Sequence, residues 1–215
     1  MRYALGIPTV GNVVTAFDNH LAVAVELGRM GEVVIATPNN VLPHDRVREL
    51  IVDIAIEQEC DRLLFMDSDT GAGYGDASKL ASTMDSVGAQ VAAGHYFQRG
   101  YPYACIWARM DNGVSSHVDA MRGVHEIHGA GMGFTLVDVL WCKKHLQRPW
   151  FKIEDVDGQP RLWEDFYFCK KVYEAGGCVI GDADVRVVHV GDGERIDDMS
   201  VDLLRQLYLK RHPCE

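Results

Sequence analysis

The segment that decides the fold is RLLFMDSDT at residues 62–70, in which an apolar run leads directly into two aspartates. The run has little alternation of apolar and polar residues, which is typical of a central strand buried on both faces. Asp67 and Asp69 follow it, and in an extended chain side chains two residues apart point to the same side. Two neighbouring carboxylates repel each other, and a divalent cation such as Mg²⁺ or Mn²⁺ removes that repulsion. The segment therefore predicts a metal site, although the same aspartates could simply cap a turn before Gly71.

Strand-like and helix-like runs alternate on both sides of this segment. We expect strands at residues 3–7, 32–36 and 90–97, and helices at residues 17–30, 44–60 and 76–86. In the less regular second half, a helix is expected at 162–175 and strands at 104–109, 124–128, 132–137, around Val179 and at 185–190. This alternation predicts an α/β fold around a largely parallel sheet. Ligands of such sheets bind at the carboxyl ends of the strands, so residues 8–12, 38–40 and 67–69 are expected to line one site.

The composition is that of a globular domain with a full core. The 215 residues suit one domain, and 47% of them are hydrophobic while 24% are charged. The 21 basic and 31 acidic residues give a formal net charge of -10, which disfavours direct binding to nucleic acid. A phosphate ligand remains compatible with this charge, because a bound divalent cation can invert the local electrostatics.

The six cysteines include no CxxC pair, and a chain of this length does not need disulfides for stability. We expect reduced cysteines and a cytoplasmic protein. Residues 1–12 contain one early arginine and a short apolar stretch before Pro8, too short for a signal peptide or a membrane span. No transmembrane segment is expected, and a homo-oligomer remains possible.

The segment LLFMDSDT resembles the DxD signature of nucleotide-diphospho-sugar transferases with the GT-A fold. Other segments resemble parts of the same enzymes in the same order along residues 3–191. IPTVGN at 7–12 is similar to the loop that holds the nucleobase, and residues 44–60 are similar to the arginine-bearing helix that precedes the DxD strand. GAGMGFTLVDVLWCKKH at 129–145 resembles the glycine segment of the acceptor half. WEDFYFCKKVYEAGG at 163–177 resembles the ED-containing helix of family 2-like members, and VRVVHVG at 185–191 resembles a late strand with a metal-binding histidine.

This resemblance implies a GT-A (Rossmann-like) three-layer α/β/α sandwich with a mostly parallel central sheet. It implies one catalytic domain over 1–215, with a nucleotide-sugar-binding half at about 1–97, an acceptor half at about 98–195 and a C-terminal helix at 196–215. The implied activity is a hexosyltransferase-like glycosyltransferase that uses Mn²⁺ or Mg²⁺. It would transfer a sugar from a UDP- or GDP-sugar to the hydroxyl of an acceptor that the sequence does not identify.

The resemblance also implies roles for individual residues. The implied metal ligands are Asp67, Asp69 and His189. The implied catalytic residues are Asp165 and Glu164, with Asp165 as the general base of an inverting enzyme. The implied donor-binding residues are Pro8, Thr9, Arg46, Asp67, Ser68 and Gly131.

Several of these assignments have alternatives. Acidic residues at 164 and 165 are also favourable at a helix start through the helix dipole. Arg46 is preferred to Arg48 as the phosphate partner because its position resembles that of the family's donor-side arginine. Gly131 would let the backbone approach the sugar closely. The residues after the ED pair depart from the common EDxDF form, and the sequence does not decide between inversion and retention.

Two other functions remain open. A nucleotidyltransferase that makes a nucleotide sugar would share the fold, but IPTVGN carries no basic residue for a triphosphate. A non-catalytic nucleotide- or sugar-binding module is the second alternative. Residues 97–103, with three aromatic side chains and Arg99, could shape a donor or acceptor pocket. The amphipathic residues 201–211 are expected to pack on their own domain, or else to contact a membrane or partner.

Overall fold

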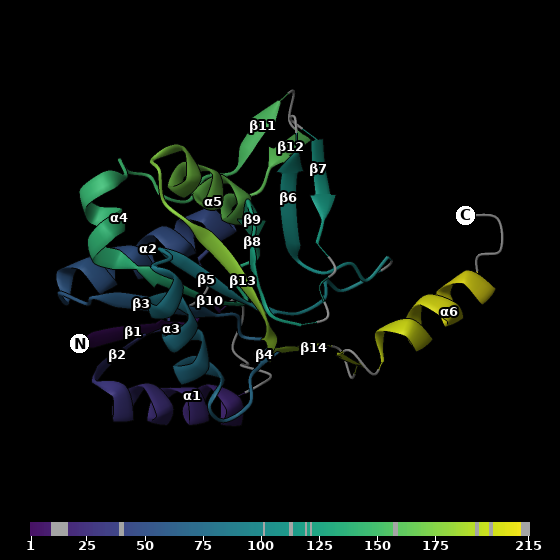
Figure 1. Ribbon diagram of the computed structural model, residues 1–215, viewed down its shortest axis with the longest axis horizontal. Coiled ribbons are helices and arrows are strands. Elements are labelled where there is room, and N and C mark those ends of the chain that lie inside the picture. Colours follow the sequence, from purple (N-terminus) through teal and green to yellow (C-terminus); the bar gives the residue numbers. More distant parts are fainter. Residues whose placement is uncertain are drawn as a thin grey trace.

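A seven-stranded sheet forms the centre of the protein in the computed structural model, which describes residues 1–9, 17–38, 41–100, 102–111, 114–118, 120, 122–156, 159–191, 194–197 and 200–211 (Figure 1). The strands follow the order β2 (Glu32–Ala36), β1 (Arg2–Gly6), β3 (Arg62–Met66), β10 (Phe134–Asp138), β5 (Val91–His95), β13 (Val179–Arg186) and β8 (Val124–Glu126). Five of the seven run parallel, whereas β10 and β8 are antiparallel to their neighbours. The segment that follows β3 therefore leaves the sheet near its middle.

Helices cover both faces of this sheet, and each face has its own hydrophobic core (Figure 1). Side chains of α2 (His44–Glu57), α4 (Val139–His145) and α5 (Glu164–Glu174) pack on one face together with Leu63 and Phe65 of β3. Side chains of α1 (Phe17–Met30) and α3 (Asp76–Val87) pack on the other face together with Leu64 and Met66. All five residues of β3 are buried, which explains why this strand has no polar face.

Three smaller sheets surround the central one. One contains β15 (Glu194–Ile196), β14 (Val188–Gly191) and β4 (Thr70–Gly71), and it joins the segment after Asp69 to the segment that carries His189. The second contains β7 (Val114–His117), β6 (Trp107–Asp111) and β9 (Gly129–Ala130). The third is the hairpin of β11 (Glu154–Val156) and β12 (Gln159–Leu162), which leads directly into α5.

The prediction of a mixed α/β fold with a mostly parallel central sheet is confirmed. The strand expected at 132–137 is β10, which runs antiparallel between β3 and β5, a direction that periodicity does not encode. The three-layer sandwich and the division into two halves stay predictions.

The last helix, α6 (Val201–Arg211), extends away from the body (Figure 1). Its first turns contact the body, because Val201 is buried and Arg205 donates hydrogen bonds to the carbonyls of Pro102 and Tyr103. Leu207 and Leu209 further along are exposed. Within the described ranges, no helix combines the length and the apolar character needed to cross a membrane.

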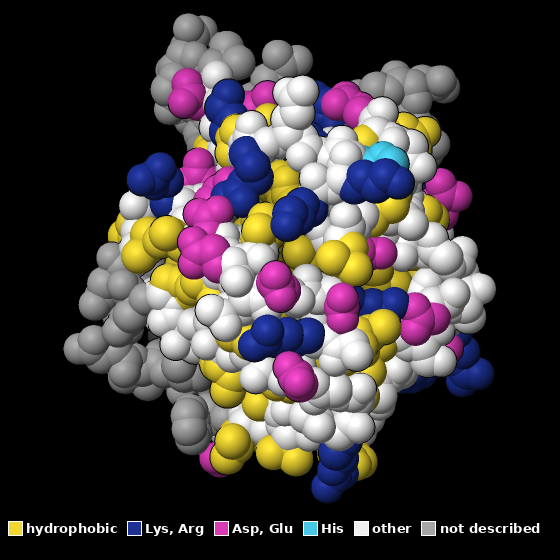
Figure 2. All heavy atoms as spheres, turned by 90° about the vertical axis from the view of Figure 1, so that its left-hand side faces the viewer, with side chains coloured by type: hydrophobic (Ala, Val, Ile, Leu, Met, Phe, Trp, Pro, Cys, Tyr) yellow, Lys and Arg dark blue, Asp and Glu magenta, His cyan; other side chains and the backbone are white. Residues whose placement is uncertain are grey.

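Figure 2 shows the face from which the parallel strands start, and on it basic, acidic and apolar side chains are interspersed. Ion pairs occur at the beginnings of two of these strands, between Arg2 of β1 and Glu32 and between Arg62 of β3 and Asp85. The charged residues of greatest chemical interest lie at the opposite ends of the strands.

Candidate active site

The aspartates of the DSD motif lie in a tight turn, and their carboxylates face different partners. The Thr70 amide donates to the carbonyl of Asp67 at 3.1 Å, while the Asp67 amide and the Thr70 hydroxyl donate to the carbonyl of Gly133 at 3.0 and 2.7 Å. The buried ring of His20 contacts the same Asp67 carbonyl through Nε2 at 2.9 Å. The rule that residues two apart share a side holds for extended chain, so it does not hold for this turn.

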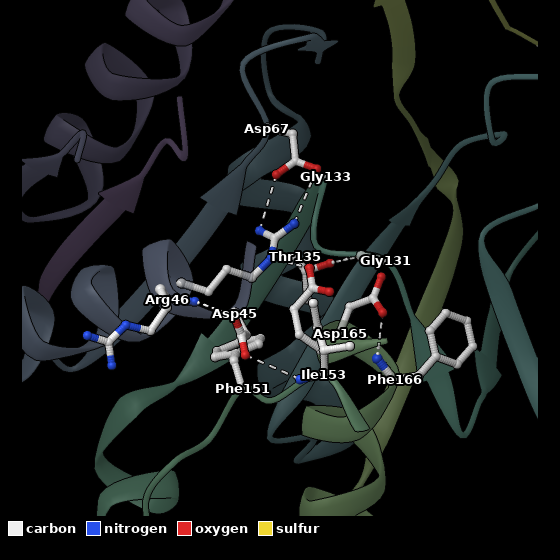
Figure 3. Close-up of polar contacts among 12 residues, drawn as sticks. Asp45, Arg46, Asp67, Gly131, Gly133, Thr135, Phe151, Ile153, Asp165 and Phe166 are labelled. Atoms are coloured by element: carbon white, nitrogen blue, oxygen red, sulfur yellow. Dashed lines mark hydrogen bonds and ion pairs between the residues drawn. The ribbon is translucent and has the colours of Figure 1, made fainter. Parts of the chain in front are cut away.

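Asp67 belongs to a buried ion-pair cluster around Arg48 of α2. The guanidinium Nη1 and Nη2 atoms lie 3.2 and 3.5 Å from Asp67 Oδ1 and Oδ2, and its Nε lies 3.1 Å from Glu164 Oε1 (Figure 3). Arg48 and Glu164 are only 4% and 5% exposed, so both charges depend on this pairing for compensation. The cluster ties the start of α5 to the carboxyl end of β3. Glu164 thus forms an ion pair with Arg48, and its catalytic role stays a prediction.

Asp165 is the partly exposed carboxyl beside this cluster. Its Oδ1 accepts a hydrogen bond from the Phe166 amide at 2.7 Å (Figure 3). Burial and the charge of Glu164 raise the pKa of Asp165 to about 7, although Arg48 partly opposes the shift. The single positive charge of Arg48 does not balance the negative charges of Asp67, Glu164 and Asp165 together. Its proton affinity therefore suits a general base near neutral pH.

Asp69 lies beside His189 and Arg99. Its Oδ2 is 3.5 Å from His189 Nε2 and 2.6 Å from an Nη atom of Arg99, and the Val190 amide donates to its carbonyl at 2.6 Å. Burial opposes ionisation of Asp69, but the hydrogen bond and charge of His189, together with Arg99, hold its pKa below the ordinary value. Asp69 is therefore anionic at neutral pH.

His189 is oriented by the backbone. Its Nδ1 lies 2.9 Å from the carbonyl of Phe97, and a carbonyl oxygen only accepts hydrogen bonds. A protonated His189 ring donates from Nε2 to Asp69, whereas a neutral ring carries its proton on Nδ1 and turns the lone pair of Nε2 toward Asp69. Two acceptors at 3.5 Å repel unless a cation lies between them or the ring is protonated. In metal-binding histidines the ring nitrogen that does not bind the metal commonly donates a hydrogen bond to a backbone carbonyl, as His189 Nδ1 can do to Phe97. The Asp69–His189 pair therefore fits a divalent cation.

The three predicted metal ligands do not converge on one point. Among the described residues, no group of three or more histidine, cysteine, aspartate or glutamate side chains gathers as a metal site. Asp69 and His189 are adjacent, whereas Asp67 faces Arg48. Metal ligation by all three residues stays a prediction, and only the Asp69–His189 pair has supporting geometry.

The predicted donor-side residues are distributed around the strand ends. Pro8 and Thr9 follow β1 and are buried, and the Thr9 hydroxyl donates to the carbonyl of Pro38 after β2 at 3.1 Å. Ser68 is partly buried between the two aspartates. Residues 10–16 and 39–40, which complete the expected loops, lie outside the described residues.

The two arginines of α2 differ in environment. Arg46 is exposed, and its side chain points away from Asp67 (Figure 3). Arg48 is buried at the cluster. The donor-side role of Arg46 therefore stays a prediction without support from its position, and Arg48 is the arginine that the structure brings to the site. Helical spacing could have indicated this, because Arg48 lies one position after buried Val47 and three before buried Ile51.

Packing accounts for the glycines at 131 and 133. A Cβ atom at Gly131 would lie 2.5 Å from the Tyr96 hydroxyl and 2.7 Å from Ile106 Cγ1, and one at Gly133 would lie 2.6 Å from the same hydroxyl. The Gly133 amide donates to Tyr96 Oη at 2.8 Å. The carbonyl of Gly131 accepts from the Thr135 hydroxyl at 2.8 Å (Figure 3). Close approach of a sugar is not needed to explain either glycine, and donor binding by Gly131 stays a prediction.

Sequence reasoning missed His20 and Tyr96, which support the turn and the glycine segment. His20 could have been found, because it is spaced three and seven residues from Val23 and Leu27 on the buried face of α1. Tyr96 carries no such signal, since its partner Gly133 is 37 positions away.

A cavity of about 420 Å³ lies beside the β4–β14 ladder, and its described lining residues are Asn19, Gly71, Ala72, Gly73, Asp76, Arg186, Val187, Val188, Val190 and Asp197. None of these lining residues is a member of the Arg48 cluster or of the Asp69–His189 pair. We therefore place the candidate active site by its charged groups and not by this cavity.

No protein-family model matches the chain, and no match is found among curated proteins. Among solved structures, A197 from STIV is 20% identical, with a TM-score of 0.65 over 92% of this chain and 94% of that one. GalNAc-T7 crystallised with UDP, GalNAc and Mn²⁺ is 11% identical, with a TM-score of 0.51 over 88% of this chain. The match spans 44% of the GalNAc-T7 chain. At these identities the likeness concerns the fold alone, and it supports a GT-A-like fold.

Proposed function

We propose that this protein is a metal-dependent glycosyltransferase that transfers a hexosyl group from a nucleoside-diphosphate sugar to an acceptor hydroxyl. The observation that carries the proposal is the oriented Asp69–His189 pair after β3, and the start of α5 adds a carboxyl group, Asp165, with a pKa of about 7. The fold of GalNAc-T7, crystallised with UDP, GalNAc and Mn²⁺, supports a UDP-sugar and Mn²⁺ as the first ligands to test.

The donor set suits Mn²⁺ or Mg²⁺. Asp69 would offer a carboxylate oxygen and His189 a neutral imidazole nitrogen, and these two atoms already lie 3.5 Å apart. Two protein ligands leave the other positions for water and diphosphate oxygens, as is usual for these ions. A bound ion would supply positive charge to the leaving diphosphate. Asp67, which faces Arg48, would instead fix the turn that carries Asp69.

Asp165 would act as the general base of an inverting transfer. Its carboxylate would take the proton of the acceptor hydroxyl while the acceptor oxygen bonds to the anomeric carbon of the sugar. The bond from that carbon to the donor phosphate oxygen breaks, and its electron pair leaves with the nucleoside diphosphate. Arg48 and Glu164 would hold the start of α5, and hence Asp165, at a fixed position relative to β3.

Thermal unfolding with UDP, GDP, CDP and their sugars, each with and without Mn²⁺, tests the proposal. A ligand that binds only the folded state stabilises it by about 2.7 kcal/mol at a hundred-fold excess over its dissociation constant. We expect one diphosphate to raise the unfolding temperature only when Mn²⁺ is present. Asp69→Ala should remove that shift, whereas Asp184→Ala, a change at an exposed aspartate of β13, should preserve it.

Turnover then separates the three functions. Release of the nucleoside diphosphate from the sugar donor identifies a transferase. Binding without turnover would indicate a binding module, and release of pyrophosphate from a nucleoside triphosphate would indicate a nucleotidyltransferase. Absence of a shift with every diphosphate would remove the basis for the metal site.

A further inference from the structure

The guanidinium of Arg99 forms an ion pair with Asp69. Its Nη2 atom lies 2.6 Å from Asp69 Oδ2, the same oxygen that faces His189 Nε2 at 3.5 Å. The Asp69 side chain is 17% exposed, whereas that of Arg99 is 52% exposed. Arg99 therefore neutralises a partly buried carboxylate while about half of its own side chain is exposed to solvent.

The backbone on both sides of Arg99 is held in place. The carbonyl of Phe97 binds His189, and the Gln98 amide donates to the carbonyl of Ala104 at 2.9 Å. Arg205 of α6 donates to the carbonyls of residues 102 and 103 at 3.0 and 2.9 Å, and its guanidinium lies 5.9 Å from the centre of the Phe97 ring. Arg99 can therefore change partner by rotation of its own long side chain, without movement of the backbone.

We propose that Arg99 is a switchable cation that pairs with Asp69 before the donor binds and then moves to the donor diphosphate. The inference rests on the proposed function, because it needs a divalent cation at Asp69 and His189. A cation at Asp69 Oδ2 and the guanidinium of Arg99 would repel each other at this short range. The incoming diphosphate carries oxygens that a guanidinium binds well, so it provides the alternative partner. Arg99 is thus a donor-positioning residue whose resting contact weakens the binding of the metal alone.

The proposal predicts effects of opposite sign in one variant. In isothermal titration calorimetry, Arg99→Gln should bind Mn²⁺ alone about fivefold more tightly than the wild type, because a partly exposed ion pair no longer competes. With Mn²⁺ saturating, the same variant should bind UDP at least about tenfold more weakly, because a charge-assisted contact to phosphate is lost. Arg99→Lys retains the charge and should keep the weak binding of Mn²⁺ alone. Arg29→Gln, which removes a charge from α1 beside Tyr74, should change neither affinity.

The outcomes separate this inference from the proposed function. If Arg99→Gln binds Mn²⁺ as tightly as the wild type or more weakly, the proposed switch is wrong. The metal site is a separate question, and it stands if His189→Ala abolishes Mn²⁺ binding. Unchanged UDP binding by Arg99→Gln also overturns it. If the wild type and every variant fail to bind Mn²⁺, both proposals are wrong. If the opposite-signed effects occur in a protein that does not turn over any sugar donor, the switch stands and the transferase assignment does not.

Discussion

At the scale of single residues, Asp165 is the group whose environment most changes its chemistry. The residue before it, Glu164, is paired with Arg48, and so is Asp67. Among the described side chains Asp165 has no ion pair of its own, and burial together with the charge of Glu164 raises its pKa to about 7. Its protonation state therefore changes within the physiological pH range, which is a testable property of a general base.

The turnover of a sugar donor should follow the ionisation of Asp165. Deprotonated Asp165 would take the proton from the hydroxyl group that attacks the sugar. We therefore expect kcat/KM to rise with pH and to level off above about pH 7. Asp165→Asn should lower kcat by roughly 10²–10⁴-fold while donor affinity is kept. A pH–rate profile of both proteins, with Asp184→Asn as the control, measures this. Full turnover by Asp165→Asn would exclude Asp165 as the base.

The stability of the protein should also depend on Asp165. Its pKa is about 7 in the folded chain and about 3.9 in an unfolded one, so between these values the folded state binds more protons. The contribution of this residue to stability therefore falls as pH rises from about 4 to 7. Asp165→Asn removes that dependence, and it should exceed the wild type in unfolding free energy by on the order of 1–2 kcal/mol at pH 8. Urea titrations at pH 5 and pH 8 test this, and an equal difference at both would contradict it.

At the scale of elements, one buried arginine connects three of them. Arg48 on α2 reaches Asp67 at the end of β3 and Glu164 at the start of α5, which is 116 positions away. The buried carboxylate of Glu164 depends on it for compensation, because the cost of an unpaired buried charge is high. The same region contains Gly131 and Gly133, where a hydroxyl of Tyr96 fills the space that a side chain would need.

Replacement of the two arginines of α2 by methionine should have very different effects. Arg48→Met leaves Asp67 and Glu164 without their cation, and it is expected to lower the free energy of unfolding by about 3–5 kcal/mol. Arg46→Met changes an exposed side chain on the same helix and should stay within about 0.5 kcal/mol of the wild type. Urea denaturation at pH 7 compares the two, and similar losses would mean that the buried cluster does not stabilise the fold.

Alanine substitutions at two glycines test the packing of the glycine segment. Gly131→Ala would bring Cβ to 2.5 Å from the Tyr96 hydroxyl, and it should cost about 1–3 kcal/mol through overpacking. Gly28→Ala lies in α1 with nothing within 4 Å of the new Cβ, and it should stabilise the protein by up to about 1 kcal/mol. Thermal unfolding of both variants measures the contrast. A stable Gly131→Ala protein with impaired donor binding would instead support a donor-side role for this glycine.

At the scale of the whole molecule, the charged residues of the candidate site lie where the parallel strands end. The turn after β3, the strand β14 and the start of α5 come from three regions of the chain, and the β4–β14 ladder and the Arg48 cluster hold them together. Arg205 of α6 adds a connection from the last helix to the residues around Arg99. The site therefore depends on the assembled sheet, and no single segment contains it.

The sequence by itself determined the buried strand β3, the position of the DSD motif at its carboxyl end and the acidic pair at the start of α5. These features are local, because burial on both faces removes polar residues from a strand and acidic residues suit the start of a helix. Only the tertiary structure decided that Arg48 meets both Asp67 and Glu164, that the turn separates Asp67 from Asp69, and that Asp165 has a raised pKa. The ion pairs join residues 19 and 116 positions apart, and the pKa of Asp165 depends on burial in the assembled fold; local periodicity encodes neither. Burial in the assembled fold then determines at which pH Asp165 is charged.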